Sequence, residues 1–256
     1  MFYKIHSTTF VKQKHKTSFC QIAQYKIQMN KIKILFFVVS FFVIKLLPAQ
    51  TYDFYDNEIK RVQFIAKGGF TISNNSKVAP GQKGKENTIF GYNAGVIANI
   101  YLDGGIHLQS GVNITTRGSK IKKFSTTDNP KDKLRMEMLY LQVPLLFVFK
   151  IPVNDTGEDS FNFGLGPYYA YGLNGKIKSK RKDSSFEELK AFGKDGVCND
   201  SDWGIIAQAQ YERSKFIISY GAEIGLAQVM KKEALPAGFS KNIRNFGFSA
   251  SIGYKF

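Results

Sequence analysis

The C-terminal stretch, residues 244–256, constrains the fold more than any other part of this chain. Apolar side chains stand there at every second position, with small or polar residues between them. A β-strand places alternate side chains on opposite faces. One face would therefore be wholly apolar, formed by Phe246, Phe248, Ala250, Ile252, Tyr254 and Phe256. A soluble barrel or sandwich buries such a face, whereas a membrane barrel points it at lipid and ends its strands with interfacial aromatic residues.

The same alternation recurs along the chain and predicts eight strands. They are expected at residues 62–73, 90–102, 106–115, 135–151, 161–173, 203–211, 216–226 and 246–256. Asp103-Gly104 indicates a tight hairpin turn, and Arg213 and Ser214 indicate another. Pro144 cannot donate a ladder hydrogen bond, so we expect a bulge or break in the fourth strand.

The predicted connections alternate between long and short. Four long polar loops are expected at about residues 74–89, 119–134, 174–201 and 229–243, and the third would hold a short helix at 185–191. Long loops on one side only are typical of a membrane barrel. An even number of strands places both termini of the barrel domain on the side of the short turns. The prediction is an all-β protein: an eight-stranded antiparallel up-and-down transmembrane β-barrel in the outer membrane, preceded by a signal peptide.

A soluble lipocalin-like barrel is the main alternative, and the second face of the strands decides against it. That face is polar and rich in glycine, which suits a side-chain-filled interior better than an apolar ligand site. Lys67 and Glu223, with Lys255 between them, are a candidate buried charge cluster; independent solvation of each is the alternative. We expect a polar interior cluster that includes Lys67, Glu223, Lys255, Gln208, Gln210 and His107.

The N-terminal region predicts export from the cytoplasm. Residues 29–49 have a basic start, an apolar run and a small residue before a polar one, as a signal peptide does, with cleavage expected after Ala49. We expect residues 1–28 to be an over-called extension that precedes the true start at Met29; the alternative is a start at Met1 and a signal peptide with a long charged region. A retained membrane anchor is a weaker alternative, because the apolar run at 34–44 is too short to span a bilayer and Lys45 interrupts it. Residues 50–61 would then be a periplasmic lead-in, and residues 62–256 the barrel domain.

Charge is concentrated in the loops. The mature chain would carry 28 basic and 20 acidic residues, a net charge of +8, and the four long loops hold 18 basic against 9 acidic residues. Such a basic surface can bind anionic lipid head groups, including those of lipopolysaccharide, or serve solubility alone. The candidate basic loop patch is Lys178, Lys180, Arg181 and Lys182. Nucleic acid is not an expected partner, because these runs lack neighbouring aromatic platforms.

Three segments resemble the PorT-like outer-membrane β-barrel family of the Bacteroidetes. They are Tyr140-Leu-Gln-Val-Pro-Leu-Leu146, Phe163-Gly-Leu-Gly-Pro-Tyr-Tyr169 with Tyr171-Gly-Leu173, and Gly253-Tyr-Lys-Phe256. The resemblance covers about residues 60–256 and implies a barrel in the outer membrane. It carries no functional residue and does not imply PorT's own role in type IX secretion.

The sequence favours no enzyme. The mature chain keeps one histidine, His107, expected inside the barrel, and one cysteine, Cys198, which alone makes neither an internal disulfide nor a zinc site. No catalytic, cofactor or metal site is therefore predicted. Three functions stay open: a membrane scaffold, binding surface or secretion accessory; a narrow passive channel; and a soluble ligand-binding barrel. The first is preferred, because an eight-stranded barrel is just wide enough for its own side chains.

Overall fold

The structure is a computed structural model that describes residues 51–52, 58–59, 61–75, 85–124, 132–154, 159–180, 187–231 and 243–256. It divides into two compact units, 1–61 and 62–256. In the first unit, β1 (Thr51–Tyr52) pairs with β2 (Glu58–Ile59) as a short antiparallel ribbon. The predicted extension and signal peptide lie outside the described residues. No helix long and apolar enough to cross a bilayer occurs in the described ranges.

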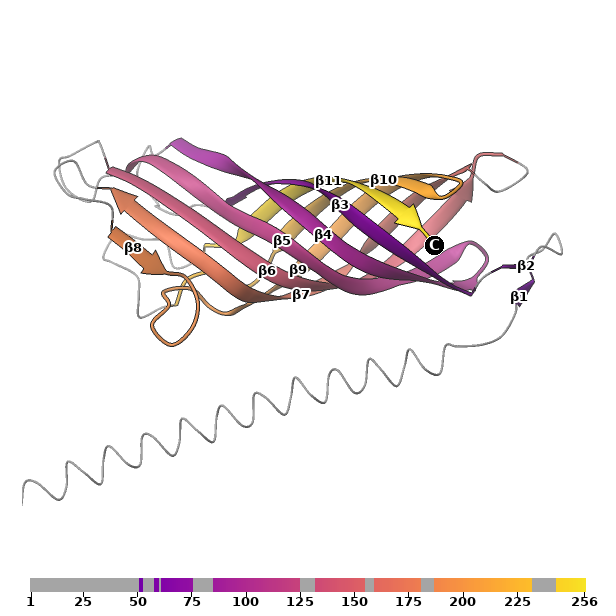
Figure 1. The fold of residues 1–256 in the computed structure, drawn as a ribbon, viewed down its shortest axis with the longest axis horizontal. Coiled ribbons are helices and arrows are strands. Elements are labelled where there is room, and N and C mark those ends of the chain that lie inside the picture. Colours follow the sequence, from indigo (N-terminus) through magenta and orange to yellow (C-terminus); the bar gives the residue numbers. More distant parts are fainter. Residues whose placement is uncertain are drawn as a thin grey trace, which may run out of the picture. The chain divides into compact units, whose positions relative to one another are not determined.

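The second unit is a closed antiparallel barrel of eight strands (Figure 1). Its strands are β3 (Val62–Asn75), β4 (Lys85–Asp103), β5 (Ile106–Phe124), β6 (Asp132–Pro152), β7 (Asp159–Lys180), β9 (Ser201–Arg213), β10 (Phe216–Gly225) and β11 (Asn245–Lys255). Their order around the ring is β6-β5-β4-β3-β11-β10-β9-β7, and the β6–β7 pairing closes it. β8 (Glu187–Lys190) adds a further strand to the long-loop end of β7. The predicted fold class is confirmed.

The two ends of the barrel differ as predicted. At one end the connections are short: Gly104 and Gly105 turn β4 into β5 with positive φ angles of 55° and 82°, which glycine adopts without strain. The turn between β9 and β10 lies at Ser214 and Lys215, one residue later than expected, and Ser214 has a φ of 54°. The C-terminus of the chain lies at this short-turn end as well (Figure 1).

The two faces of the strands also follow the predicted alternation. Along β6 the outward residues are apolar from Leu139 to Phe149, whereas Tyr140, Gln142 and Val148 are buried inside. The outward face of the whole barrel carries large exposed apolar side chains, among them Phe70, Phe90, Val96, Leu165, Trp203, Tyr220, Phe248 and Ile252. An apolar belt of this kind is stable in lipid and would aggregate in water. The soluble lipocalin-like alternative, which needs the apolar face inside, is therefore wrong.

Three of the predicted loops are shorter than expected because the strands continue beyond the apolar belt. β4 begins at Lys85, β5 ends at Phe124, β6 begins at Asp132 and β7 ends at Lys180. Backbone pairing persists there, but the outward positions no longer face lipid and are charged, so the apolar alternation that marks a strand disappears. The predicted helix at 185–191 is wrong, because Glu187–Lys190 forms β8 and pairs with Lys176–Ser179.

The local break expected at Pro144 is present, but without a bulge. The pairing of β6 with β5 leaves out Val143 and Pro144, and its register is the same on both sides, at Asn113–Gln142 and Ser110–Leu145. The register of β6 with β7 shifts instead between Leu139 and Tyr140, where Leu173 of β7 is the extra residue. A bulge at Leu173 reverses the in-out phase of β7, so that Ile177, at an odd position, faces inward and is buried.

Candidate functional site

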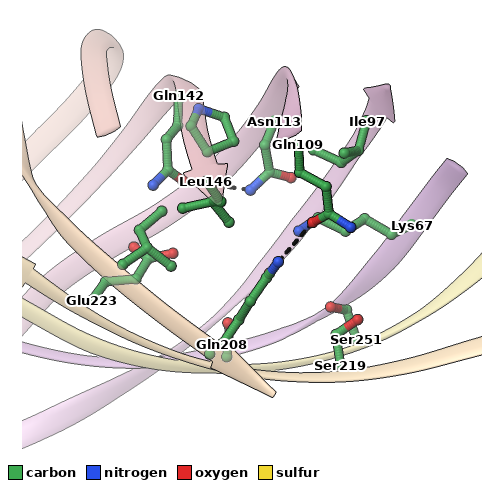
Figure 2. A pocket seen from close by; sticks show the side chains of 14 residues that line it. Lys67, Ile97, Gln109, Asn113, Gln142, Leu146, Gln208, Ser219, Glu223 and Ser251 are labelled. Atoms are coloured by element: carbon green, nitrogen blue, oxygen red, sulfur yellow. Dashed lines mark hydrogen bonds between the residues drawn. The ribbon is translucent and has the colours of Figure 1, made fainter. Parts of the chain in front are cut away.

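The middle of the barrel is filled by an amide network (Figure 2). Gln208 Nε2 donates to Gln109 Oε1 at 2.6 Å (Figure 2). Gln109 Nε2 donates in turn to Gln210 Oε1 at 3.3 Å. Asn113 Nδ2 lies 3.5 Å from the oxygen of Gln142. All of these side chains except Gln210 line, with Lys67 and Glu223, a cavity of about 20 Å³, which is room for little more than one water molecule. Gln208 and Gln210 therefore lie in the interior, as predicted from their phase.

A second network closes the short-turn end. Glu212, which is buried, accepts hydrogen bonds from Lys150 Nζ at 3.1 Å and Asn162 Nδ2 at 3.2 Å, and forms an ion pair with Lys255. Two ammonium groups on one carboxylate satisfy its lone pairs, which a buried charge requires. His107 lies at this end too, with Nδ1 3.3 Å from the carbonyl oxygen of Gly105.

A third network lies toward the long-loop end and is centred on Arg117. Its Nη1 lies 2.7 Å from Asp202 Oδ2, its Nη2 lies 2.5 Å from Glu223 Oε2, and Nη1 also donates to the hydroxyl of Tyr168 at 3.1 Å. The guanidinium group stands over the rings of Tyr168 and Tyr140, 4.5 and 5.5 Å from their centroids. The planar fork of arginine suits such a site because it pairs with two carboxylates and stacks on rings at once.

An apolar lid covers the third network. The lid consists of Ala191, Phe192, Val197, Cys198, Val229, Met230 and Ile243, which pack in one cluster with inward residues of β6 and β7 such as Met136, Met138 and Ile177. Its backbone is held by hydrogen bonds from Cys198 N to Ala191 O and from Val229 N to Ile243 O, at 2.7 and 2.9 Å. Burial raises the pKa of the Cys198 thiol to about 12. The sequence predicted these segments only as loops, because they have no strand periodicity.

The predicted charge cluster is distributed over these networks. Glu223 pairs with Arg117, Lys255 pairs with Glu212 at the opposite end, and Lys67 lines the central cavity. Among the described ion pairs, none joins Lys67, Glu223 and Lys255 to one another. Sequence reasoning missed Arg117 and Asp202. Arg117 could have been found, because it continues the odd-numbered inward series of β5 that runs from His107 to Thr115.

The outward surface has an aromatic belt near each end of the apolar band. Toward the short turns, Phe216 packs on Tyr254 and Phe161 on Tyr211, with ring centroids 5.6 and 5.1 Å apart. Toward the long loops, Phe70 packs on Phe90 at 5.1 Å and Phe246 on Phe248 at 4.9 Å. Trp203 and Tyr169 are paired neighbours on the same outward face of β9 and β7. Aromatic belts of this kind mark the two interfaces of a membrane barrel.

The predicted basic loop patch is partly described. Lys178 lies 3.9 Å from Glu188 across the β7–β8 pair, and Glu188 also accepts from Lys176 at 2.6 Å. The hydrogen bond from Lys176 holds the pKa of the Glu188 carboxyl below its usual value. Lys180 ends β7, whereas Arg181 and Lys182 lie outside the described residues. Beside this patch, Leu173, Leu189, Phe192, Lys176 and Lys190 line an open groove of about 380 Å³.

No metal-binding arrangement occurs within the part of the chain that the structure describes. It holds no group of three or more His, Cys, Asp or Glu side chains placed to bind a metal ion. His107 contacts the ring of Tyr101 and the Gly105 carbonyl group, and Cys198 is enclosed by the lid. What the geometry offers is a filled barrel whose accessible surfaces are the lipid-facing wall and the long-loop end.

The closed barrel, its outward apolar band and its two aromatic belts define a β-barrel membrane protein. A family model described as "Outer membrane protein beta-barrel domain" matches residues 49–231, so the chain belongs to that family and is an outer-membrane protein. No curated protein matches the chain.

Solved structures with similarity to the chain include three bacterial surface barrels. One is Ail, the attachment invasion locus protein of Yersinia pestis, in complex with the heparin analogue sucrose octasulfate, at 15% identity and a TM-score of 0.39 over 77% of this chain and 100% of that one. OprG of Pseudomonas aeruginosa shows 14% identity and a TM-score of 0.43 over 77% and 97%. Neisserial surface protein A shows 11% identity and a TM-score of 0.39 over 75% and 97%.

Proposed function

We propose that this protein is a non-enzymatic, PorT-like member of its family that works as a membrane-anchored scaffold and binding surface. The observation that supports this is the filled interior: a central cavity of about 20 Å³ lies between two buried ion-pair networks, under an apolar lid. If the barrel carries neither solutes nor a ligand inside, its function takes place on its outward surface and at its long-loop end. In outer-membrane barrels the long loops are extracellular and the short turns periplasmic.

The proposed partners are outer-membrane lipid, including lipopolysaccharide, and a second surface or secretion protein. The basic excess of the extracellular part supports the lipid, because each Lys or Arg near an anionic surface is worth about 1 kcal/mol. The strand extensions beyond the apolar belt support either partner, since they present ordered backbone outside the membrane.

Planar-bilayer recording tests this proposal against the narrow passive channel. The purified full-length protein, reconstituted at single-barrel density, should give no steady ion conductance at ±100 mV. An Arg117→Ala, Glu223→Ala, Gln109→Ala variant, which removes filling side chains, serves as the positive control for detection of a leak. Steady conductance of the unmodified protein would identify a channel and contradict the scaffold.

Cross-linking of intact cells, followed by purification of the barrel from outer membranes, tests the binding role. We expect lipopolysaccharide or a defined surface protein to be recovered with the wild-type chain. The variant with Lys178, Lys180, Arg181 and Lys182 replaced by glutamine tests the basic loop patch, because its barrel should fold unchanged while recovery falls and loses its salt dependence. Equal recovery would remove that patch from the mechanism.

A further inference from the structure

Two prolines interrupt the hydrogen-bond ladders on both sides of β6, in the middle of the barrel wall. The pairing of β6 with β5 leaves out residues 111–112 and 143–144, and its pairing with β7 leaves out residues 145–146 and 166–167. These four stretches are called here the proline section, because Pro144 and Pro167 belong to them. Both prolines lie in the segments that resemble the PorT-like family, 140–146 and 163–169, so the interruptions are a structural consequence of those segments.

Each gap has the form that the loss of one donor produces. Proline has no backbone N–H, and opposed residues in an antiparallel ladder alternate between hydrogen-bonded and non-hydrogen-bonded pairs. A proline in a hydrogen-bonded pair therefore removes that pair and one pair next to it, which is the extent of both gaps. The hydroxyl group of Ser110 donates to the carbonyl oxygen of Pro144 at 2.9 Å, so the backbone polar groups of Pro144 point to β5. The carbonyl oxygens left without a ladder donor are those of Gly111, opposite Pro144, and Leu145, opposite Pro167.

Both oxygens lie at the depth of the hydrocarbon. Val143 and Leu145 belong to the outward apolar series of β6, which runs from Leu139 to Phe149, and their side chains are 38% and 43% exposed. The proline section stands at the middle of this series. No water reaches a backbone group from the lipid, and an unsatisfied group in hydrocarbon is costly. A donor supplied from inside the barrel would therefore stabilise this section.

The central cavity lies directly behind the section. Pro144 and Leu146 line it together with Gln142 and Asn113 (Figure 2). Gln142 Nε2 and Asn113 Oδ1 are buried and have no hydrogen-bond partner among the described residues. A cavity that offers a donor, an acceptor and room for one water molecule is a site that water occupies. Water bound there lies on the inner side of the wall in which the two carbonyl oxygens lack a donor.

We propose that the proline section is a hydration site in the membrane-embedded wall: it opens locally in the folded barrel and admits water from the central cavity to the carbonyl groups of Gly111 and Leu145. One ladder bond is missing on each side of the same stretch of β6, so local opening breaks fewer bonds there than elsewhere. The β10–β11 seam shows the contrast, because its pairing is continuous over residues 216–224. The ion-pair networks toward the two ends stay closed, so the opening gives no path for ions. The inference goes beyond the proposed function and does not rest on it.

Hydrogen exchange of single backbone amides tests the proposal. The isotopically labelled folded protein is reconstituted in phosphatidylcholine nanodiscs and transferred to D₂O, and NMR follows the amide signals. The amides of Gly111 and Leu145 should exchange at least about tenfold faster than those of Tyr220 and Ala250, which are paired at the middle of the continuous β10–β11 seam. Equal protection of the two sets of amides would overturn the proposal.

Variants that restore the missing donors test each seam by itself. Pro144→Ala supplies an N–H for the Gly111 carbonyl oxygen and should slow exchange at Gly111 about tenfold, whereas Pro167→Ala should do the same at Leu145. Pro152→Ala is the control, because Pro152 is exposed at the end of β6 and the same chemical change there should leave both rates unchanged. Fast exchange that persists in both donor-restoring variants would overturn the proposal, as would an equal slowing in the control. None of these rates depends on ion conductance or on a bound partner, so the inference and the proposed function can fail separately.

Discussion

Arg117 of β5 and Asp202 of β9 meet across the interior of the barrel with Nη1 and Oδ2 only 2.7 Å apart. The two strands are not neighbours in the ring, so this contact ties opposite walls together. Asp202 also accepts from Asn245 Nδ2 of β11 at 2.9 Å and from the Tyr168 hydroxyl of β7 at 3.2 Å. The Arg117–Asp202 ion pair and its hydrogen bonds thus connect β5, β7, β9 and β11 inside the barrel, at the end covered by the lid.

Removal of the arginine should be costly. Arg117→Met leaves Asp202 and Glu223 buried without their cation, and loss of one partner of a buried ion pair costs about 3–5 kcal/mol. Urea unfolding in lipid vesicles measures this loss. The matched variant Arg117→Met, Asp202→Asn, Glu223→Gln removes all three charges and should regain much of the stability. A cost below about 1 kcal/mol for Arg117→Met alone would show that the network is not structural.

The strands and the direction of their side chains could be predicted from the sequence because lipid surrounds the barrel. Within the apolar belt, lipid outside and polar side chains inside give each strand two chemically different faces, and the predicted faces of all eight strands match the structure. Beyond the belt both faces meet water or protein. There β5, β6 and β7 continue without an alternation of apolar and polar residues, so the sequence predicted loops at their ends.

Cross-strand contacts were harder to predict because they depend on register. Lys67, Glu223 and Lys255 have the right phase to meet inside, but the register places Lys67 opposite Gly253 and Glu223 opposite Gly247 on β11. Several residues along the strand separate those two levels. The bulge at Leu173 and the lid depend on contacts between distant segments, such as Phe192 with Tyr140, for which the sequence has no periodic signal.

A close approach of three strands explains why glycine stands at position 91. Where the pairing of β4 with β5 shifts register, Thr116 Oγ1 accepts from Tyr92 N at 2.6 Å. A Cβ at Gly91 would lie 1.9 Å from that oxygen and 2.9 Å from Thr71 Oγ1. Gly91→Ala should therefore cost about 1–3 kcal/mol by overpacking. Gly247→Ala is the control, because its Cβ would meet its nearest neighbour at 3.5 Å; equal stability of the two variants in urea unfolding would contradict this account.

Thiol labelling of Cys198 should report the state of the lid. The thiol is fully buried and its pKa is raised to about 12 by that burial, so at pH 8 only about one molecule in ten thousand is a thiolate while the lid is closed. Maleimide should label the folded mature protein far more slowly than the urea-unfolded chain, and more quickly as the pH rises toward 12. Phe192→Ala loosens the lid and should speed labelling at pH 8. Equal rates for folded and unfolded protein would show that the lid does not stay closed.

Depth in the membrane gives the last prediction. Ala250 lies near the middle of the outward series of β11, which runs from Phe246 to Phe256, whereas Ile218 on β10 is only two residues from Phe216 in the belt at the short-turn end. An arginine at the midplane of a barrel costs about 2–4 kcal/mol and near an interface about 0–1. Ala250→Arg should therefore destabilise the barrel more than Ile218→Arg.

The control for this depth series is Val153→Arg, since Val153 is exposed in the turn that follows β6, and its cost should be close to zero. An inward substitution such as Ser249→Arg fails for another reason, because Ser249 lines the cavity of about 20 Å³ beside Lys67 and leaves no room for a second cation. The stability of all four variants is measured by folding into lipid vesicles, first with acyl chains of one length and then with shorter acyl chains. Because the penalty at Ala250 comes from loss of hydration, thinner bilayers should reduce it while leaving the cost at Ser249 unchanged. An equal response of both positions to bilayer thickness would mean that Ala250 does not face lipid.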